Sequence, residues 1–117
     1  MKILVLEKRV PDLVEDLEVD STGTALDPDS VTLTLNEFDD HALEEALLLK
    51  DDTGGNVTVM ALDSEDVDKS IYIALALGVD RAIKISCSEA VDGNLGRAQV
   101  FAPQIQSEDY DLILTGV

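Results

Sequence analysis

The run ILVL at residues 3–6 predicts a β-strand, because four consecutive apolar side chains suit a strand that is covered on both faces. Three later runs have a similar character: VTVMAL (57–62), AIKI (82–85) and LIL (112–114). Between them lie segments with the apolar spacing of an α-helix, at 39–50, 64–77 and roughly 94–106. Strands that alternate with helices predict right-handed βαβ crossovers, and therefore an α/β fold: an open parallel sheet with helices on both faces.

The ends of the predicted helices carry different signals. Gly54 and Gly55 follow the first helix and Gly78 follows the second, as expected of C-terminal stops. Pro103 lies inside the third helical pattern, where proline removes a backbone N–H and clashes with the preceding turn. We therefore expect the third helix not to run unbroken to its end.

About 28 residues, 8–35, separate the first strand from the first helix. They contain two strand-like runs, EDLEV (15–19) and VTLTL (31–35), with the turn-rich segments DSTG and DPDS between them. We interpret this stretch as a β-hairpin-like excursion at the carboxyl edge of the sheet. Long excursions inside compact domains are usually functional.

The composition excludes several classes of protein. The chain has 117 residues, enough for one domain over residues 1–117, with 8 Lys and Arg against 25 Asp and Glu and a net charge of −17. Nucleic-acid binding needs a basic face and usually aromatic platforms, but aromatic residues make up only 3%. One cysteine and one histidine, Cys87 and His41, exclude a disulfide scaffold or a zinc site built from them. We interpret Cys87 as a small apolar filler and His41 as a helix-surface residue.

The apolar runs are too short for a spanning helix, and residues 1–6 lack the features of a secretory leader. We therefore expect a cytoplasmic protein without membrane insertion. The acidic residues are spread from Glu7 to Asp111 rather than gathered in a tail. Because self-repulsion of this size disfavours the compact state and concentrated salt screens it, we hypothesise a host with a salt-rich cytoplasm.

The strand ends predict where a ligand binds, since open α/β sheets bind ligands at the carboxyl ends of their strands. The segments expected there are 6–10, 36–39, 62–64 and 115–117. Asn36 is a good helix N-cap, and Asp39 stands three residues later in a capping-box-like arrangement. These two residues either cap the helix only, or cap a helix end that also faces a nucleotide; the two interpretations are compatible.

Lys8 and Arg9 directly follow the first strand and are two of only eight cations. They indicate an anion or an inter-subunit carboxylate, with a surface pair in local salt bridges as the alternative. Glu7 is unusual at the end of a buried strand, and either base is a possible partner for it. The sequence contains no recognisable nucleophile–base pair, GxGxxG or GxxxxGK[ST], so we predict no catalytic or metal site. The chain stops at Val117 without an element to cover its last strand, which we interpret as a fragment or a domain that needs a partner.

Several stretches, in order and spanning nearly the whole chain, resemble the beta subunit of electron transfer flavoprotein, also called FixA. They are KILVLEKRVPD (2–12), EVDSTGTALD (18–27), LNEFDDHALEEALLLK (35–50), IALALGVDRAIKI (73–85) and DYDLILTG (109–116). The resemblance implies an adenine-nucleotide alpha hydrolase-like (Rossmann-like) fold with a five-stranded parallel core. It also implies an electron carrier rather than an enzyme, and a chain corresponding to the N-terminal half of that subunit.

The resemblance further implies cofactors and partners. The family's beta subunit binds AMP, or a second FAD in bifurcating members, and pairs with an FAD-bearing alpha subunit. The dimer carries electrons from dehydrogenases to a quinone oxidoreductase or another acceptor. Combined with the strand-end positions, this makes the following our candidate cofactor-binding residues: Leu6, Lys8, Asn36, Phe38, Asp39, Leu62, Gly116 and Val117.

The chain departs from the family pattern in places. Glu37 stands where the family usually has proline, Glu7 where it has an apolar residue, and Leu62-Asp63 where a small glycine-containing turn is common. The alternative function is a stand-alone ATP- or AMP-binding module of the universal-stress-protein kind, and a third is a structural fragment that binds nothing. The long excursion after the first strand argues against the stress-protein module, which usually enters its first helix soon after that strand.

Overall fold

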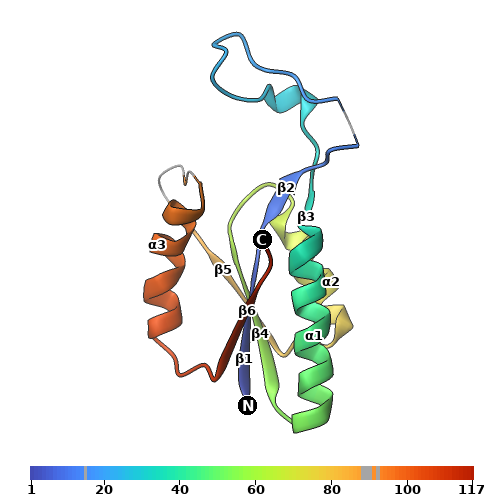
Figure 1. The fold of residues 1–117 in the computed structure, drawn as a ribbon, viewed down its shortest axis with the longest axis vertical. Coiled ribbons are helices and arrows are strands. Elements are labelled where there is room, and N and C mark those ends of the chain that lie inside the picture. Colours follow the sequence, from blue (N-terminus) through green and yellow to red (C-terminus); the bar gives the residue numbers. More distant parts are fainter. Residues whose placement is uncertain (15, 88–90, 92) are drawn as a thin grey trace.

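A computed structural model describes residues 1–14, 16–87, 91 and 93–117. Its central sheet has four strands, all parallel, in the order β5-β4-β1-β6 (Figure 1). The strands are β1 (Lys2–Glu7), β4 (Asn56–Leu62), β5 (Arg81–Ile85) and β6 (Leu112–Thr115). The predicted open parallel sheet is therefore confirmed, and the described residues supply four of the five strands that the resemblance implies.

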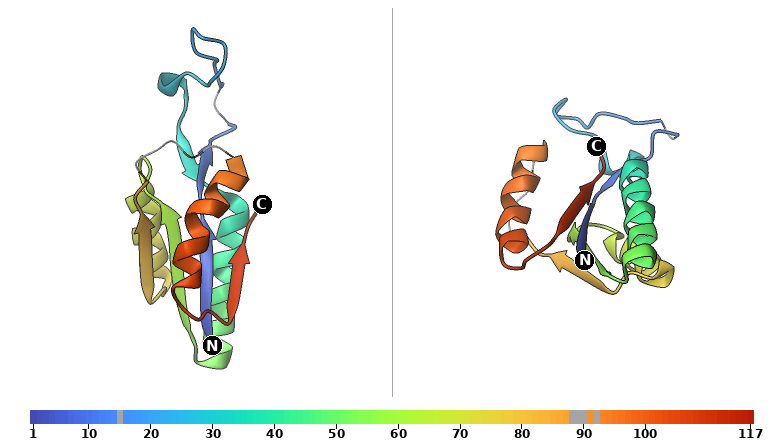
Figure 2. Two further views of the ribbon diagram at one scale, coloured as in Figure 1. Left: turned by 90° about the vertical axis from the view of Figure 1, so that its left-hand side faces the viewer. Right: turned by 60° about the horizontal axis from the view of Figure 1, so that its bottom comes forward.

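Helices cover both faces of this sheet (Figure 2). α1 (Glu37–Thr53) and α2 (Val67–Leu77) lie on one face, and α3 (Gly93–Gln106) lies on the other. The side chains of β1 alternate between the two faces: Ile3 and Val5 pack with α1, whereas Leu4 packs with Phe101 of α3. This double burial explains why the first strand is a continuous apolar run.

The order of the strands creates a switch point between β1 and β6. The chain passes from β1 through α1 to β4 and through α2 to β5, each time to the next strand outward. It then crosses back through α3 and adds β6 to the opposite side of β1, with Leu6 paired to Thr115. The crevice at the carboxyl ends of β1 and β6 is where this fold class places ligands.

α3 contradicts one prediction, because it continues through Pro103 to Gln106. Phe101 and Ile105, on either side of the proline, both pack in the apolar cluster against the sheet. The carbonyl that loses its helical partner belongs to Gln99, which is exposed to solvent. Packing and solvation together therefore hold the helix through the proline.

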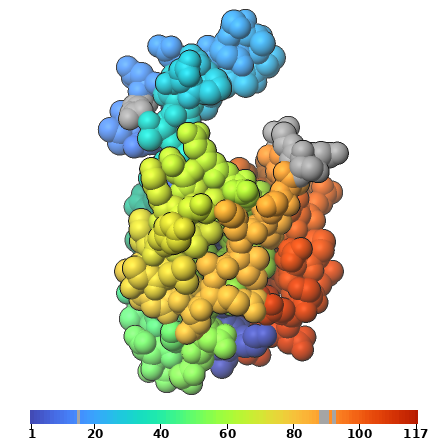
Figure 3. Space-filling model, turned by 180° about the vertical axis from the view of Figure 1, so that it is seen from behind, coloured from blue at the N-terminus to red at the C-terminus, as the bar shows by residue number. Residues whose placement is uncertain are grey.

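The excursion after β1 is confirmed, with different strands from those predicted. β2 (Arg9–Pro11) pairs antiparallel with β3 (Leu33–Leu35) at the carboxyl edge of the sheet. Beyond them the chain makes a single bridge between Val19 and Leu26 and a short 3₁₀ turn, η1 (Pro28–Ser30). Figure 3 shows this segment projecting from one end of the molecule.

The predicted strand 15–19 is wrong for residues 16–19, of which only Val19 pairs, while Glu15 lies outside the described residues. In the run 31–35 only the last three residues form a strand. Leu13, Val14 and Val19 are exposed, so no apolar layer covers this part of the excursion and supports a longer ladder. No helix in the described parts of the chain is long and apolar enough to cross a membrane.

Candidate functional site

Asp39 joins the ends of β1 and β6 at the switch point. Its side chain is buried, and its two carboxylate oxygens accept the backbone N–H groups of Lys8 and Gly116, each at 2.9 Å. These donors follow the neighbouring strands β1 and β6. The carboxylate therefore sets the spacing of the two strand ends around the crevice.

Asn36 makes a second connection of the same kind. Its side-chain N–H donates to the carbonyl of Val117 at 3.0 Å, and its backbone N–H donates to the carbonyl of Lys8. Asn36 is the residue before α1, but it makes no side-chain capping bond, and the carboxylate of Asp39 is used elsewhere. The predicted capping box is therefore wrong: the strand ends provide these buried side chains with partners instead.

Gly116 permits the close approach of β6 to α1. A Cβ atom added at this glycine would lie 2.4 Å from Oδ1 of Asp39 and 2.6 Å from its backbone nitrogen. No other residue fits between the strand end and the helix without moving one of them. The first turn of α1 therefore lies directly against the end of the last strand.

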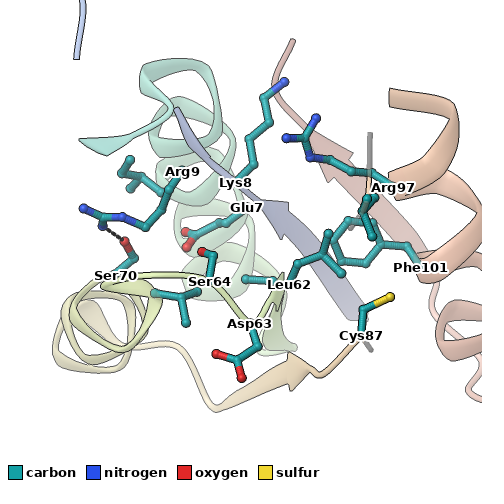
Figure 4. A pocket seen from close by; sticks show the side chains of 14 residues that line it. Glu7, Lys8, Arg9, Leu62, Asp63, Ser64, Ser70, Cys87, Arg97 and Phe101 are labelled. Carbon is teal, nitrogen blue, oxygen red and sulfur yellow. Dashed lines mark hydrogen bonds between the residues drawn. The ribbon is translucent and has the colours of Figure 1, made fainter. Parts of the chain in front are cut away.

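Two cavities adjoin at this edge of the sheet. The larger, about 430 Å³, lies between α3 and the ends of β1 and β6, and we call it the β6 cavity. The smaller, about 260 Å³, lies over the end of β4 and reaches the start of α2, and we call it the β4 cavity (Figure 4). Four residues line both: Glu7, Lys8, Arg97 and Phe101. The cavities therefore form neighbouring parts of one recess.

Glu7 is a buried acid at the boundary of the two cavities. Only 3% of the residue is exposed, and neither carboxyl oxygen has a hydrogen-bond partner in the described structure. Burial raises the pKa of Glu7 to about 7, and the nearby carboxylates of Asp39 and Asp40 add to the shift. Neither base that follows β1 forms an ion pair with it among the described residues, although the sequence made both possible partners.

Lys8 and Arg9 have different roles. Arg9 donates from its two terminal nitrogens to the Ser70 hydroxyl and the Leu33 carbonyl, both at 2.6 Å, and so fastens the excursion to α2. Figure 4 shows Arg9 directed toward Ser70, and Arg97 extending from α3 toward the end of β1. Lys8 lines both cavities. In the described part of the chain neither Lys8 nor Arg9 belongs to a salt bridge, so the surface-pair interpretation is wrong.

The structure distributes the predicted site residues over the recess and its surroundings. Leu6, Lys8, Asp39 and Gly116 line the β6 cavity, whereas Leu62 lines the β4 cavity. Asn36 is buried beside them through its bonds to the strand ends. Phe38 and Val117 are exposed and line neither cavity.

Sequence reasoning missed the contribution of α3. Arg97 and Phe101 line both cavities because the crossover brings this helix back over the strand ends. Arg97 is the one cation of the sequence after Ile85, a signal that was available in the sequence. Cys87 is exposed and lines the β4 cavity, so its interpretation as an apolar filler is wrong.

Comparisons with known proteins agree with this architecture. Residues 24–117 match the family model of the electron transfer flavoprotein domain. The chain is 37% identical to the electron transfer flavoprotein subunit beta of Methylophilus methylotrophus, over 100% of this chain and 46% of that protein. It is 33% identical to the same subunit of Bacillus subtilis, over 99% and 45%. It is 35% identical to protein FixA of Azorhizobium caulinodans, over 74% of this chain and 30% of that protein.

The chain spans about half the length of the curated beta subunits that it matches. The family model nevertheless covers most of the chain, including α1, the three parallel strands β4, β5 and β6 with their helices, and the β6 end that Asp39 holds. The resemblance found in the sequence motifs is thereby confirmed. This chain belongs to the electron transfer flavoprotein domain family.

Proposed function

We propose that this chain is part of the beta subunit of an electron transfer flavoprotein, which carries electrons together with an FAD-bearing alpha subunit. The observation that carries the proposal is the similarity along the whole chain to proteins of that name. In this role the protein is a carrier and not an enzyme. It would exchange electrons with dehydrogenases and a quinone oxidoreductase through the complete protein.

We further propose that the recess at the strand ends binds an adenine nucleotide, either AMP or a second FAD. The β6 cavity lies within the range of about 300–1,000 Å³ that is typical of ligand sites. The unpartnered carboxyl of Glu7 and the close approach at Gly116 fit a built site rather than an incidental gap. A bound flavin would supply the redox chemistry, while the protein holds and orients the group.

The candidate residues have different proposed roles in nucleotide binding, which follow from the chemistry of their side chains. Leu6 and Leu62 offer apolar surface, and their backbones lie at the strand ends where a heterocycle can be held. Lys8, with Arg97, offers positive charge for a phosphate. Asp39 and Asn36 hold the strand ends around the ligand, with Gly116 and Val117 as their partners. Phe38 is exposed at the start of α1. We propose that it contacts only the part of the ligand that extends out of the recess.

The stress-protein alternative is less well supported. None of the proteins that match this chain above carries that description. The excursion is also fastened to the domain by the bonds of Arg9, so it is an integrated part of the fold. For location we propose a salt-rich cytoplasm, on the basis of the net charge of −17.

Two experiments test the proposals separately. Co-expression with an FAD-bearing alpha subunit of the same genome should yield a yellow complex on affinity purification, and a colourless, solitary chain would contradict the carrier role. Calorimetric titration of the full chain with AMP tests the nucleotide site. The Lys8→Gln variant should bind AMP more weakly, whereas Lys69→Gln, an exposed lysine on α2, should not differ from the wild type.

A further inference from the structure

Glu7 is the one residue in the described structure whose carboxyl group has both oxygens buried and without a partner. The side chain lies at the end of β1 and borders both cavities. Figure 4 places it between Arg9 and Ser64, in the wall of the β4 cavity. Buried polar groups normally have hydrogen-bond partners. A buried carboxyl group without one beside a recess is therefore left for a ligand to pair with, once the side chains that cover its oxygens move aside.

The charged groups around Glu7 do not neutralise it. Arg9 uses its two terminal nitrogens on Ser70 and Leu33. The carboxylate of Asp39 is occupied by two backbone N–H groups.

The elements packed around Glu7 carry charges of both signs. They are Lys8 beside it in the chain, Arg9 of β2, Asp39 and Asp40 of α1, Asp63 after β4 and Arg97 of α3, while α2 presents the neutral hydroxyl of Ser70. The two acids of α1 and the loss of solvation favour the protonated form of Glu7.

We propose that Glu7 is the specificity-determining residue of the recess, and that its protonated carboxyl group pairs with the nitrogen edge of adenine. A protonated carboxyl presents one donor and one acceptor side by side. Adenine presents a matching pair, an amino donor beside a ring-nitrogen acceptor. An ionised carboxylate presents two acceptors and suits instead the two adjacent donors, N1–H and the 2-amino group, of guanine.

This inference rests on the proposed nucleotide site and adds a pH dependence to it. Because adenine pairing requires one proton on Glu7, the association constant for AMP falls about tenfold per pH unit above the pKa of the free side chain, which is about 7. The association constant for GMP rises over the same pH range, because the ionised carboxylate suits guanine. Selectivity for adenine is therefore greatest below neutral pH.

The first experiment needs no ligand. The full chain is labelled with ¹³C at its glutamate carboxyl groups, and Glu7 is assigned by its absence in the Glu7→Gln variant. We expect the Glu7 carboxyl signal to titrate near pH 7. A Glu7 signal that titrates near its ordinary value of 4.5 overturns the inference, whether or not the chain binds a nucleotide.

The second experiment measures the affinities of AMP and GMP between pH 5.5 and 8.5. The wild type should lose AMP affinity above pH 7, whereas Glu7→Gln should keep it, because a neutral amide also presents a donor and an acceptor to adenine. Glu7→Leu should bind AMP weakly at every pH. Glu44→Gln, on the exposed side of α1, is the matched control and should follow the wild type.

The outcomes separate the two proposals. If AMP binds and the wild type and Glu7→Gln share one pH profile, the role of Glu7 is overturned while the nucleotide site stands. If neither protein binds AMP or GMP at any pH, the nucleotide site itself is overturned and the role of Glu7 with it. Equal binding of AMP by Glu7→Leu and the wild type also overturns the role of Glu7.

Discussion

Asp39 and Gly116, 77 positions apart in the sequence, are joined by a hydrogen bond of 2.9 Å from the glycine N–H to a carboxylate oxygen. The other carboxylate oxygen accepts the N–H of Lys8. One side chain at the start of α1 thereby fixes the two strand ends that border the proposed ligand site. The stability and the shape of the recess depend on the same pair of bonds.

Replacing Asp39 should test this dependence. Asp39→Ala leaves two partly buried N–H groups without acceptors, so we expect a loss of about 2–4 kcal/mol in the free energy of unfolding. Urea denaturation measures it. Asp40→Ala is the matched control, because Asp40 is the exposed neighbour in the same turn, and its effect should stay below about 0.5 kcal/mol. Similar losses for both variants would contradict the role assigned to Asp39.

Gly116→Ala should destabilise the protein by about 1–3 kcal/mol, since the added methyl group overlaps with Asp39 and forces the strand end away from α1. Gly96→Ala, inside α3, is the comparison. There the new Cβ meets only a side-chain methyl of Val91 at 3.3 Å, and alanine favours the helix. We expect thermal melting to separate the two variants, and equal melting temperatures would argue against the close contact at Gly116.

Glu7 should make stability depend on pH in a defined direction. The folded state raises the pKa of Glu7 from 4.5 to about 7, so the unfolded chain releases this proton first as the pH rises. Its contribution to stability is therefore fully present below pH 4.5 and is lost between pH 4.5 and about 7, by up to about 3 kcal/mol. Glu7→Gln should match the wild type near pH 4.5 and be the more stable protein at pH 8. Urea denaturation at both pH values checks this, and a stability difference that is the same at both would refute it.

Arg9 should control the attachment of the excursion. Arg9→Met keeps the length of the side chain but removes the bonds to Ser70 and Leu33, so the segment between β2 and β3 should be cut faster by a protease. Limited proteolysis followed by mass spectrometry gives the rates and the cleavage sites. Lys69→Met serves as control, because the ion pair of Lys69 with Asp66 lies within the α2 region and does not reach the excursion. An unchanged cleavage rate in Arg9→Met would exclude this anchoring role.

Salt should stabilise the protein. The net charge of −17 implies strong self-repulsion, and raising KCl from 0.1 M to 2 M shortens the screening length from about 10 Å to below about 3 Å. The melting temperature should therefore rise over this range. A variant with Glu44 and Glu45 both changed to Lys should show a smaller rise, because its net charge is −13. Equal melting temperatures of the wild type at both salt concentrations would count against the salt-rich cytoplasm.

The sheet was predictable where a local pattern corresponds to burial on both faces. The apolar runs around Leu4, Val59 and Ile83 mark strands, and the glycine at position 54 ends α1 in a left-handed conformation, with φ 71°. The open parallel sheet also followed, since alternating strands and helices leave few topologies. These features are determined by residues that are close together in the sequence, so they can be predicted from local patterns.

The details of the site were less predictable, because they depend on partners far away in the chain. Asn36 and Asp39 look like helix caps in sequence, and only the position of β6 decides that their side chains bond to residues 116 and 117. Arg97 reaches the recess because α3 crosses back over the sheet. Pro103 would break an isolated helix, whereas the tertiary contacts of Phe101 and Ile105 preserve this one.

The central position of β1 has a consequence for synthesis on the ribosome. One edge of this strand pairs with β4, but its other edge pairs with β6, which is made after β1, β4 and β5, and Lys2 donates its backbone N–H to the side chain of Asp111. During translation one edge of β1 thus keeps its backbone N–H and C=O groups unpaired until β6 emerges from the exit tunnel. Such an open strand edge favours pairing with a second nascent chain, so correct assembly depends on prompt synthesis of β6 or on a chaperone.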